Sequence, residues 1–137
     1  MSAESDSSEF IPPFASGNRI TIEFCDRCRW LHRATWFQTE LFLTFGPKAV
    51  SSITLIPWMS DDTAGRFRVW LWMEDEKETA ADIEETGSGK KPVLVWDRKS
   101  EGGFPELKVL KQRIRDYVQP GQSLGHSDKK DENDKKT

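Results

Sequence analysis

Two cysteines, Cys25 and Cys28, are separated by two residues, and this spacing allows a small disulfide to close and to reopen by thiol exchange. They lie where the hydrophobic period of the chain changes. Apolar residues alternate with polar ones before them, which predicts a half-buried strand over 19–24. After them, apolar residues recur at helical spacing and predict a helix from residue 28 to about 45. The pair therefore occupies a strand-to-helix turn, and Cys28 should fall in or near the first helical turn.

That position favours a reactive thiol. The N-terminus of a helix carries unpaired N–H groups and a partial positive charge, which together stabilise an anion. A thiolate there has a lowered pKa, and the thiolate is the nucleophilic form of cysteine. Arg27, Arg29 and Arg33 would lower the pKa further, whereas Asp26 would raise it. His32, four residues after Cys28, either tunes the thiolate from the same helical face or points to solvent.

The main alternative for Cys25 and Cys28 is half of a zinc site, or two inert thiols. Structural zinc needs about four ligands. The chain offers no further cysteine and only His32 and His126. A redox role is therefore favoured, with no metal and no cofactor predicted.

Composition narrows the class of protein. The net charge is −3 and no basic stripe is present, so no nucleic-acid partner is expected. No apolar run approaches ~18 residues, so no membrane span is expected. No basic-then-apolar leader is recognised. We expect a cytoplasmic protein in a reducing compartment, where a lone cysteine pair is more often redox-active than a structural staple.

The chain is predicted to contain one domain over 18–121. The segment 1–17 and the charged tail 122–137 are predicted to be disordered, because they combine high charge with little apolar content. Within the domain, residues 74–91 form an acidic insert ending in Gly-Ser-Gly, interpreted as a long hairpin loop.

Further strands are predicted over 50–58, 66–73 and 93–96. The first helix should end at Gly46-Pro47 and the second should follow Pro105, with a loop over 101–104 before it. The first helix has an expected apolar stripe of Trp30, Ala34, Phe37, Leu41 and Phe45, widened by Leu31 and Phe42. The second has Leu107, Leu110, Ile114, Tyr117 and Val118. The order is β-α-β-β-β-α, which predicts an α/β fold: a four-stranded mixed sheet with two helices packed on one face.

Alternation within 66–73 separates two faces of that strand. Phe67, Val69, Leu71 and Met73 should line the core, and Trp70 and Trp72 should point to the opposite side. Three further residues are expected on the same side as these tryptophans: Trp58, Ile56 and Trp96. The first strand has polar residues at the positions that face this side, Arg19, Thr21 and Glu23, as expected if the helices leave this face of the sheet open.

The exposed tryptophans have two interpretations. A large apolar patch marks an interaction surface, at which tryptophan is enriched, and a protein partner could dock on the Trp70/Trp72 face. Alternatively, the N-terminal segment with Phe10, Ile11 and Phe14, or the acidic insert, folds over this face.

Three stretches carry a resemblance to a known family. The segment Glu23-Phe24-Cys25-Asp26-Arg27-Cys28-Arg29-Trp30 resembles the redox motif of the Rdx family, which includes selenoproteins W, T and H and their cysteine-only relatives. Residues 63–69 (TAGRFRV) are similar to the family's T-G-x-F-E-V strand entry, and 102–114 (GGFPELKVLKQRI) to the segment that opens its last helix. The resemblance covers about 18–119. It implies a thioredoxin-like fold and thiol-based redox activity, with Cys28 at the position that is selenocysteine in some members and Cys25 as its partner cysteine.

The chain departs from that pattern in three places. Asp26 stands inside the motif, where the family commonly has a small residue. Asp61-Asp62 occupies the loop expected to face the motif, where the family often has a proline. The acidic insert is longer than in selenoprotein W, and the expected absence of a membrane span argues against the selenoprotein T branch.

Two functions follow. The first is a thiol–disulfide oxidoreductase in cell redox homeostasis, in which Cys25 and Cys28 act on protein thiols or glutathione. The alternative is a redox-sensitive module that binds a protein through the tryptophan face. In thioredoxin order Cys25 attacks first; the resemblance instead favours Cys28.

Overall fold

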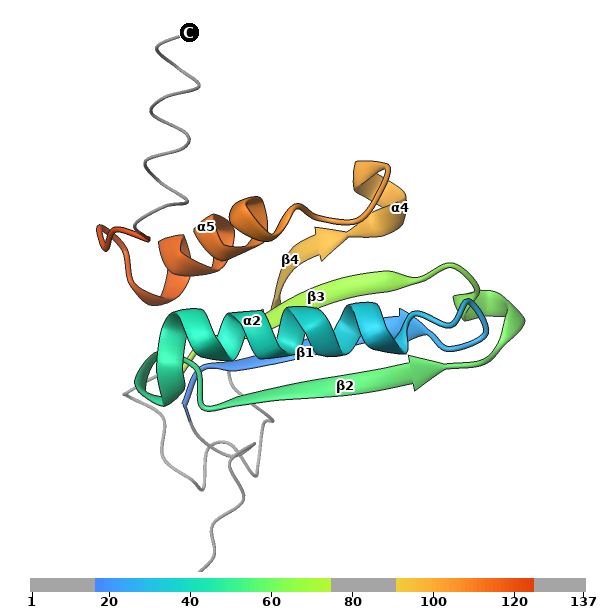
Figure 1. Cartoon of the computed structure of the whole chain (residues 1–137), viewed down its shortest axis with the longest axis horizontal. Coiled ribbons are helices and arrows are strands. Elements are labelled where there is room, and N and C mark those ends of the chain that lie inside the picture. The colour runs from blue at the N-terminus through green and yellow to red at the C-terminus, as the bar shows by residue number, and fades with distance from the viewer. Residues whose placement is uncertain (1–16, 75–90, 125–137) are drawn as a thin grey trace, which may run out of the picture.

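The computed structural model describes residues 17–74 and 91–124 (Figure 1). The predicted disorder of the two ends and the predicted loop of the acidic insert fall almost entirely outside these residues. The elements in order are β1 (Arg19–Cys25), α2 (Leu31–Ala49), β2 (Ser52–Trp58), the short 3₁₀ helix η2 (Asp61–Thr63), β3 (Phe67–Trp72), β4 (Val93–Asp97), α4 (Arg98–Glu101) and α5 (Leu107–Val118).

The four strands form one mixed sheet in the order β2-β1-β3-β4. β1 runs parallel to β2, with Cys25 opposite Trp58, and antiparallel to β3, with Phe24 opposite Phe67. Because the carboxyl ends of β1 and β2 meet at the same edge, the turn after β1 lies beside the loop after β2. The predicted α/β fold is confirmed, and the arrangement is consistent with a thioredoxin-like fold.

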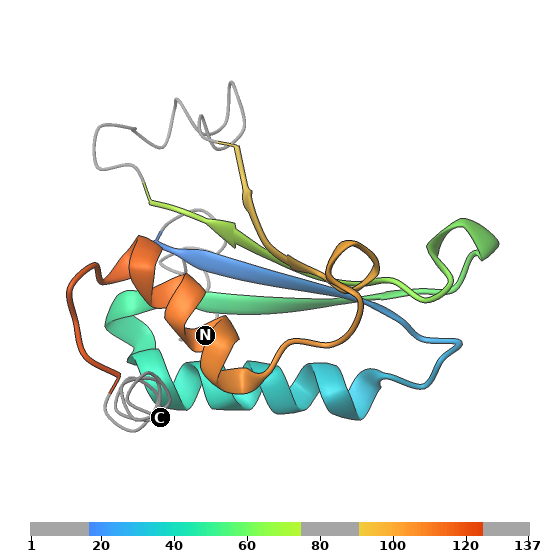
Figure 2. The same ribbon diagram turned by 90° about the horizontal axis from the view of Figure 1, so that it is seen from above.

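Helices α2 and α5 cover the same face of the sheet (Figure 2). The core between them and the sheet takes alternate residues of the strands and one stripe of each helix. Most of the predicted core positions of β3 and of the α2 stripe are confirmed: Phe67, Val69, Leu71, Ala34, Phe37, Leu41 and Phe45 are buried. Met73 and Trp30 are half-buried and pack against this core. The prediction that Leu31 and Phe42 widen the apolar stripe of α2 was wrong, because these two residues are 48% and 37% exposed. The face of the sheet opposite α2 and α5 is called the open face below.

The first helix begins later than predicted. Arg29 has a φ of 60°, a left-handed conformation that no right-handed helix contains, so α2 starts only at Leu31. Cys28 therefore lies in the turn before the helix. The predicted stop is confirmed as a break in the helix at Gly46 (φ 76°, ψ 170°), after which one more turn runs from Pro47 to Ala49.

A short third helix, α4, follows β4 directly and was not predicted. The Asp97 carboxylate caps α4 by accepting a hydrogen bond from the Lys99 N–H at 3.2 Å, and Gly102 ends it in a left-handed conformation. Trp96 was misplaced by the sequence pattern. It packs on the helix-covered face, where its indole N–H donates to the Gly103 carbonyl and Arg113 lies 4.6 Å from its ring.

No helix within residues 17–74 and 91–124 combines the length and the apolar character needed to cross a bilayer.

Candidate functional site

The turn that carries the cysteines is held from both sides. The Asp26 N–H donates to the Trp58 carbonyl at 2.9 Å, which ties the turn to the end of β2. The Cys25 N–H donates to the Arg66 carbonyl at 2.8 Å, which ties it to the loop before β3. Within the turn, the Arg29 N–H donates to the Asp26 carbonyl at 2.9 Å. The backbone around the two thiols is therefore fixed by hydrogen bonds to two neighbouring segments.

The two sulfurs lie together but differ in exposure. Cys25 ends β1 and is 1% exposed, whereas Cys28 is exposed at the tip of the turn. Both are free thiols, and the Cys28 thiol donates a hydrogen bond to the Cys25 sulfur at 2.8 Å. The structure thus brings together both residues predicted to form the site. A molecule in solution can reach Cys28, and Cys25 lies directly behind it.

The environment moves the two thiol pKa values apart. Burial raises the pKa of the Cys25 thiol, but hydrogen bonds from the Cys28 thiol and from the backbone of Gly65, Cys28 and Arg27 outweigh it, so the pKa is lowered overall. The pKa of Cys28 is raised, chiefly because its thiol proton is held in the hydrogen bond to Cys25 and secondarily by burial. The Gly65 backbone and the positive charge of Arg98 act in the opposite direction on Cys28. When the pair loses one proton, these shifts favour the negative charge on the buried Cys25 sulfur, and the hydrogen bond from Cys28 retains the remaining proton.

The loop of residues 60–66, called the Gly65 loop below, faces the motif as the sequence predicted. Arg27 donates to the Asp61 carboxylate at 2.6 Å and to the Met59 carbonyl at 3.4 Å. Because both side chains are largely exposed, this ion pair contributes little to stability. Gly65 has a φ of 76°, which a residue with a side chain adopts only under strain.

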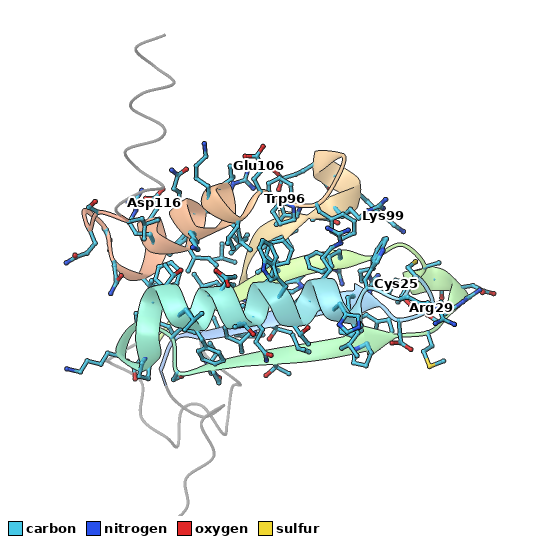
Figure 3. All side chains as sticks on the ribbon, viewed as in Figure 1. Cys25, Arg29, Trp96, Lys99, Glu106 and Asp116 are labelled. Atoms are coloured by element: carbon cyan, nitrogen blue, oxygen red, sulfur yellow. The ribbon has the colours of Figure 1, made fainter. Side chains whose placement is uncertain are left out.

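The other charged residues suggested by the sequence lie around this turn. His32 is exposed at the start of α2, in agreement with the solvent-facing alternative. Arg33 lies 4.0 Å from the Phe104 ring. Figure 3 shows Cys25, Arg29 and Lys99 of α4 at the same end of the molecule.

Arg98 is a site residue that the sequence did not indicate. It is the first residue of α4, its guanidinium lies 4.8 Å from the Trp30 ring and 5.2 Å from the Phe104 ring, and it donates to the Gly65 carbonyl at 3.3 Å. No local pattern connects Arg98 with the cysteines. Only the pairing of β3 with β4 brings the start of α4 next to the Gly65 loop.

A buried carboxylate organises the open face. Glu23 is 6% exposed, although its place in the alternation of β1 suggested an outer position. Arg68 donates to both Glu23 oxygens, at 2.7 and 2.8 Å. The indoles of Trp58 and Trp70 and the guanidinium of Arg66 also donate to Glu23. These five residues are called the Glu23 cluster. The sequence pattern did not indicate that Glu23 is buried. It is buried because long side chains from β2 and β3 close over its carboxylate.

Trp70 and Trp72 point away from the core as predicted, but they are half-buried rather than fully exposed. They line a groove of about 340 Å³ on the open face, together with Thr21, Glu23, Ile56, Arg68 and Pro92. The aromatic patch expected from the sequence is therefore a groove whose lining includes the Glu23–Arg68 ion pair. Whether the N-terminal segment or the acidic insert covers it lies outside the described residues.

Among the described residues, no three or more His, Cys, Asp or Glu side chains gather where they could hold a metal ion.

Comparisons with known proteins identify a family whose matched region includes the residues of this site. The family model described as "Rdx family" matches residues 19–116, which include both cysteines, Glu23, Gly65 and Arg98. Among solved structures, a protein from Bordetella parapertussis is 36% identical over 74% of this chain and 99% of its own, with a TM-score of 0.54. A selenoprotein W-related protein from Vibrio cholerae is 34% identical over 74% of this chain and 98% of its own, also with a TM-score of 0.54. A search of curated proteins found no match. With its redox-type cysteine pair at the end of β1, this chain belongs to the Rdx family.

Proposed function

We propose that this protein is a thiol–disulfide oxidoreductase whose Cys25 and Cys28 reduce a disulfide on a protein or on glutathione. The observation that carries the proposal is the geometry of the two sulfurs. An exposed thiol and a buried thiol with a lowered pKa lie 2.8 Å apart. Membership of the Rdx family supports it.

The first step belongs to the exposed sulfur. Transfer of the shared proton from Cys28 to Cys25 places the negative charge on Cys28. The Cys28 thiolate then attacks one sulfur of the partner disulfide. A Cys28–partner disulfide bond forms, the partner's own disulfide bond breaks, and the second partner sulfur leaves as a thiolate that takes a proton from water.

The second step belongs to the buried sulfur. Cys25 loses its proton to water and attacks the Cys28 sulfur, which forms the Cys25–Cys28 disulfide and releases the remaining partner sulfur as a thiolate. The partner has gained two electrons and the cysteine pair has lost two. The lowered pKa of Cys25 suits this step, because a thiolate is the attacking form. An external thiol restores the dithiol by the reverse exchange.

Repeated turnover tests the proposal. With excess dithiothreitol as the recycling reductant, the protein should reduce many equivalents of a small aromatic disulfide at a rate above the uncatalysed reaction. The Cys25→Ser/Cys28→Ser double variant should add nothing to that background. Consumption of a single equivalent of disulfide, followed by arrest, would contradict the enzyme proposal.

The groove on the open face favours a second candidate, a redox-sensitive binding module. Trp70 and Trp72 line the groove, and half-buried tryptophan is a common anchor for a protein partner. In that case the cysteine pair would change the affinity for the partner and would undergo only stoichiometric oxidation, so the same turnover assay distinguishes the two functions.

A further inference from the structure

The positive charge of Arg98 is placed beside the cysteine pair by aromatic residues from two elements. Its guanidinium lies against the Trp30 ring, immediately before α2, and the Phe104 ring, before α5. These two rings contact each other edge to face at a centroid distance of 4.8 Å. A planar guanidinium stacks well on aromatic faces, and such contacts restrict its position.

The same guanidinium holds the Gly65 loop. Its Nη1 donates to the Gly65 carbonyl at 3.3 Å, and a side chain added at Gly65 would lie 3.8 Å from that nitrogen. The next residue of the loop, Arg66, accepts a hydrogen bond from the Cys25 N–H at 2.8 Å. A continuous set of contacts therefore runs from the Trp30–Phe104 pair through Arg98 and the Gly65 loop to the backbone of Cys25.

The charge of Arg98 is not neutralised within the described part of the chain. There, Arg66, Arg68 and Arg113 each form an ion pair with a carboxylate, and Arg98 does not. Its Nε is the one described side-chain nitrogen or oxygen that is buried without a hydrogen-bond partner. An unpaired guanidinium in partly buried surroundings acts more strongly on a neighbouring charge than an exposed, paired one.

We propose that Arg98 is the positioning residue of the cysteine pair: it holds the Gly65 loop against the turn that carries the two cysteines and favours negative charge on the exposed Cys28. This inference rests on the proposed function of the same sulfurs. It addresses a difficulty in that function: the two pKa shifts favour the negative charge of the singly deprotonated pair on Cys25, which is buried and which a partner disulfide does not reach. The direction of the Arg98 effect on the pKa of Cys28, a lowering, agrees with this role.

Other charged groups surround the turn, and their effects on Cys28 must be distinguished from the effect of Arg98. In the turn, at the start of α2, in the Gly65 loop and at the start of α4 these are Asp26, Arg27, Arg29, His32, Arg33, Asp61, Asp62, Arg66, Asp97 and Lys99. Lys99 is the natural control. It follows Arg98 in the chain and its Cε would lie 3.7 Å from a side chain at Gly65, but it is exposed and stacks on neither ring.

The test isolates Cys28 in the full-length Cys25→Ser protein and follows its alkylation by iodoacetamide between pH 5 and 10. Removing a nearby positive charge disfavours the thiolate, so Arg98→Met should move the midpoint of the profile upward. An upward shift of about half to one pKa unit lowers the rate at pH 7 roughly three- to tenfold. At high pH, where Cys28 is fully ionised, the rate should equal or slightly exceed that of the parent, because thiolates of higher pKa are more nucleophilic.

Three further variants sharpen the result. Arg98→Gln keeps a donor for the Gly65 carbonyl but no charge, so it should show the same upward shift and serves if Arg98→Met fails to fold. Arg98→Lys should recover part of the parental midpoint, and Lys99→Met should leave it unchanged. An unchanged midpoint in folded Arg98→Met or Arg98→Gln, or an equal shift in Lys99→Met, would overturn the proposal. Alkylation consumes no disulfide, so this result is independent of whether the pair turns over.

Discussion

Cys25→Ser should trap a mixed disulfide on Cys28, and Cys28→Ser should trap little or none on Cys25. The reason is accessibility: Cys28 is exposed, whereas Cys25 is 1% exposed at the end of β1. Attack on a disulfide requires a direct approach of the thiolate to sulfur, and a buried sulfur cannot make that approach to an external molecule. Removing Cys25 also removes the only thiol placed to resolve the adduct.

The measurement is intact-protein mass spectrometry after each single variant reacts with a small aromatic disulfide. We expect the adduct on Cys28 to form at least about tenfold faster than that on Cys25, because thiol exchange depends on access as well as pKa. The wild-type protein should instead end as the internal disulfide, without adduct. Faster trapping on Cys25 would reverse the assigned order and restore the thioredoxin-like one.

Glu23→Ala should destabilise the protein more than any other single substitution on the open face of the sheet. The change leaves Arg66 and Arg68 without their carboxylate and the Trp58 and Trp70 indoles without their acceptor. Removing one partner of a buried ion pair typically costs about 3–5 kcal/mol. Since the side chains of Arg66 and Arg68 remain about a quarter exposed, at 26% and 27%, we expect about 3 kcal/mol, at the lower end. In a domain of this size that lowers Tm by more than about 10 °C.

Matched variants identify the cause. Glu101→Ala also removes a carboxylate that pairs with an arginine, Arg113, but at a more exposed site, and should cost less than about 1 kcal/mol. Trp70→Phe removes one N–H donor from Glu23 and should cost about 1–2 kcal/mol, whereas Trp72→Phe should stay within about 0.5 kcal/mol. Chemical denaturation gives all four values. A loss for Glu23→Ala no greater than that for Glu101→Ala would show that the cluster does not stabilise the sheet.

The Glu23 cluster also predicts that the free energy of unfolding decreases at acidic pH. Burial raises the pKa of Glu23, but hydrogen bonds from Arg68, Trp70 and Trp58 outweigh it and hold the pKa below its ordinary value of 4.5. Since the folded-state pKa is the lower one, the contribution is complete above pH 4.5 and is lost as the pH falls through the folded-state value. Glu23→Gln should flatten this part of the profile, as measured by chemical denaturation at a series of acidic pH values.

The parts of the fold that follow from local pattern could be predicted from the sequence. Alternation defined β1 and β3, helical spacing defined the inner stripe of α2, and Gly46-Pro47 marked the break in that helix. The position of the cysteine pair at the end of a strand could also be predicted, because it depends only on where the alternation of apolar and polar residues ends.

The remaining features depend on contacts between distant segments. The late start of α2 results from the left-handed Arg29, and arginine is not a residue type that signals this conformation. Alternation correctly placed Glu23 on the open face but could not show that side chains of β2 and β3 would bury it. Arg98 reaches the site only through the pairing of β4 with β3.

The reduction potential of the Cys25–Cys28 pair tests the central claim most directly. The full-length protein is equilibrated in glutathione buffers of graded ratio, trapped with acid and alkylated, and the oxidised fraction is measured by mass. We predict an internal disulfide, two hydrogens lighter than the dithiol, with a potential between roughly −270 and −200 mV, the range of thioredoxins and glutaredoxins. If both thiols remain open to alkylation in oxidising buffer, or the potential lies far below about −300 mV as in structural disulfides, the pair does not cycle and the account is wrong.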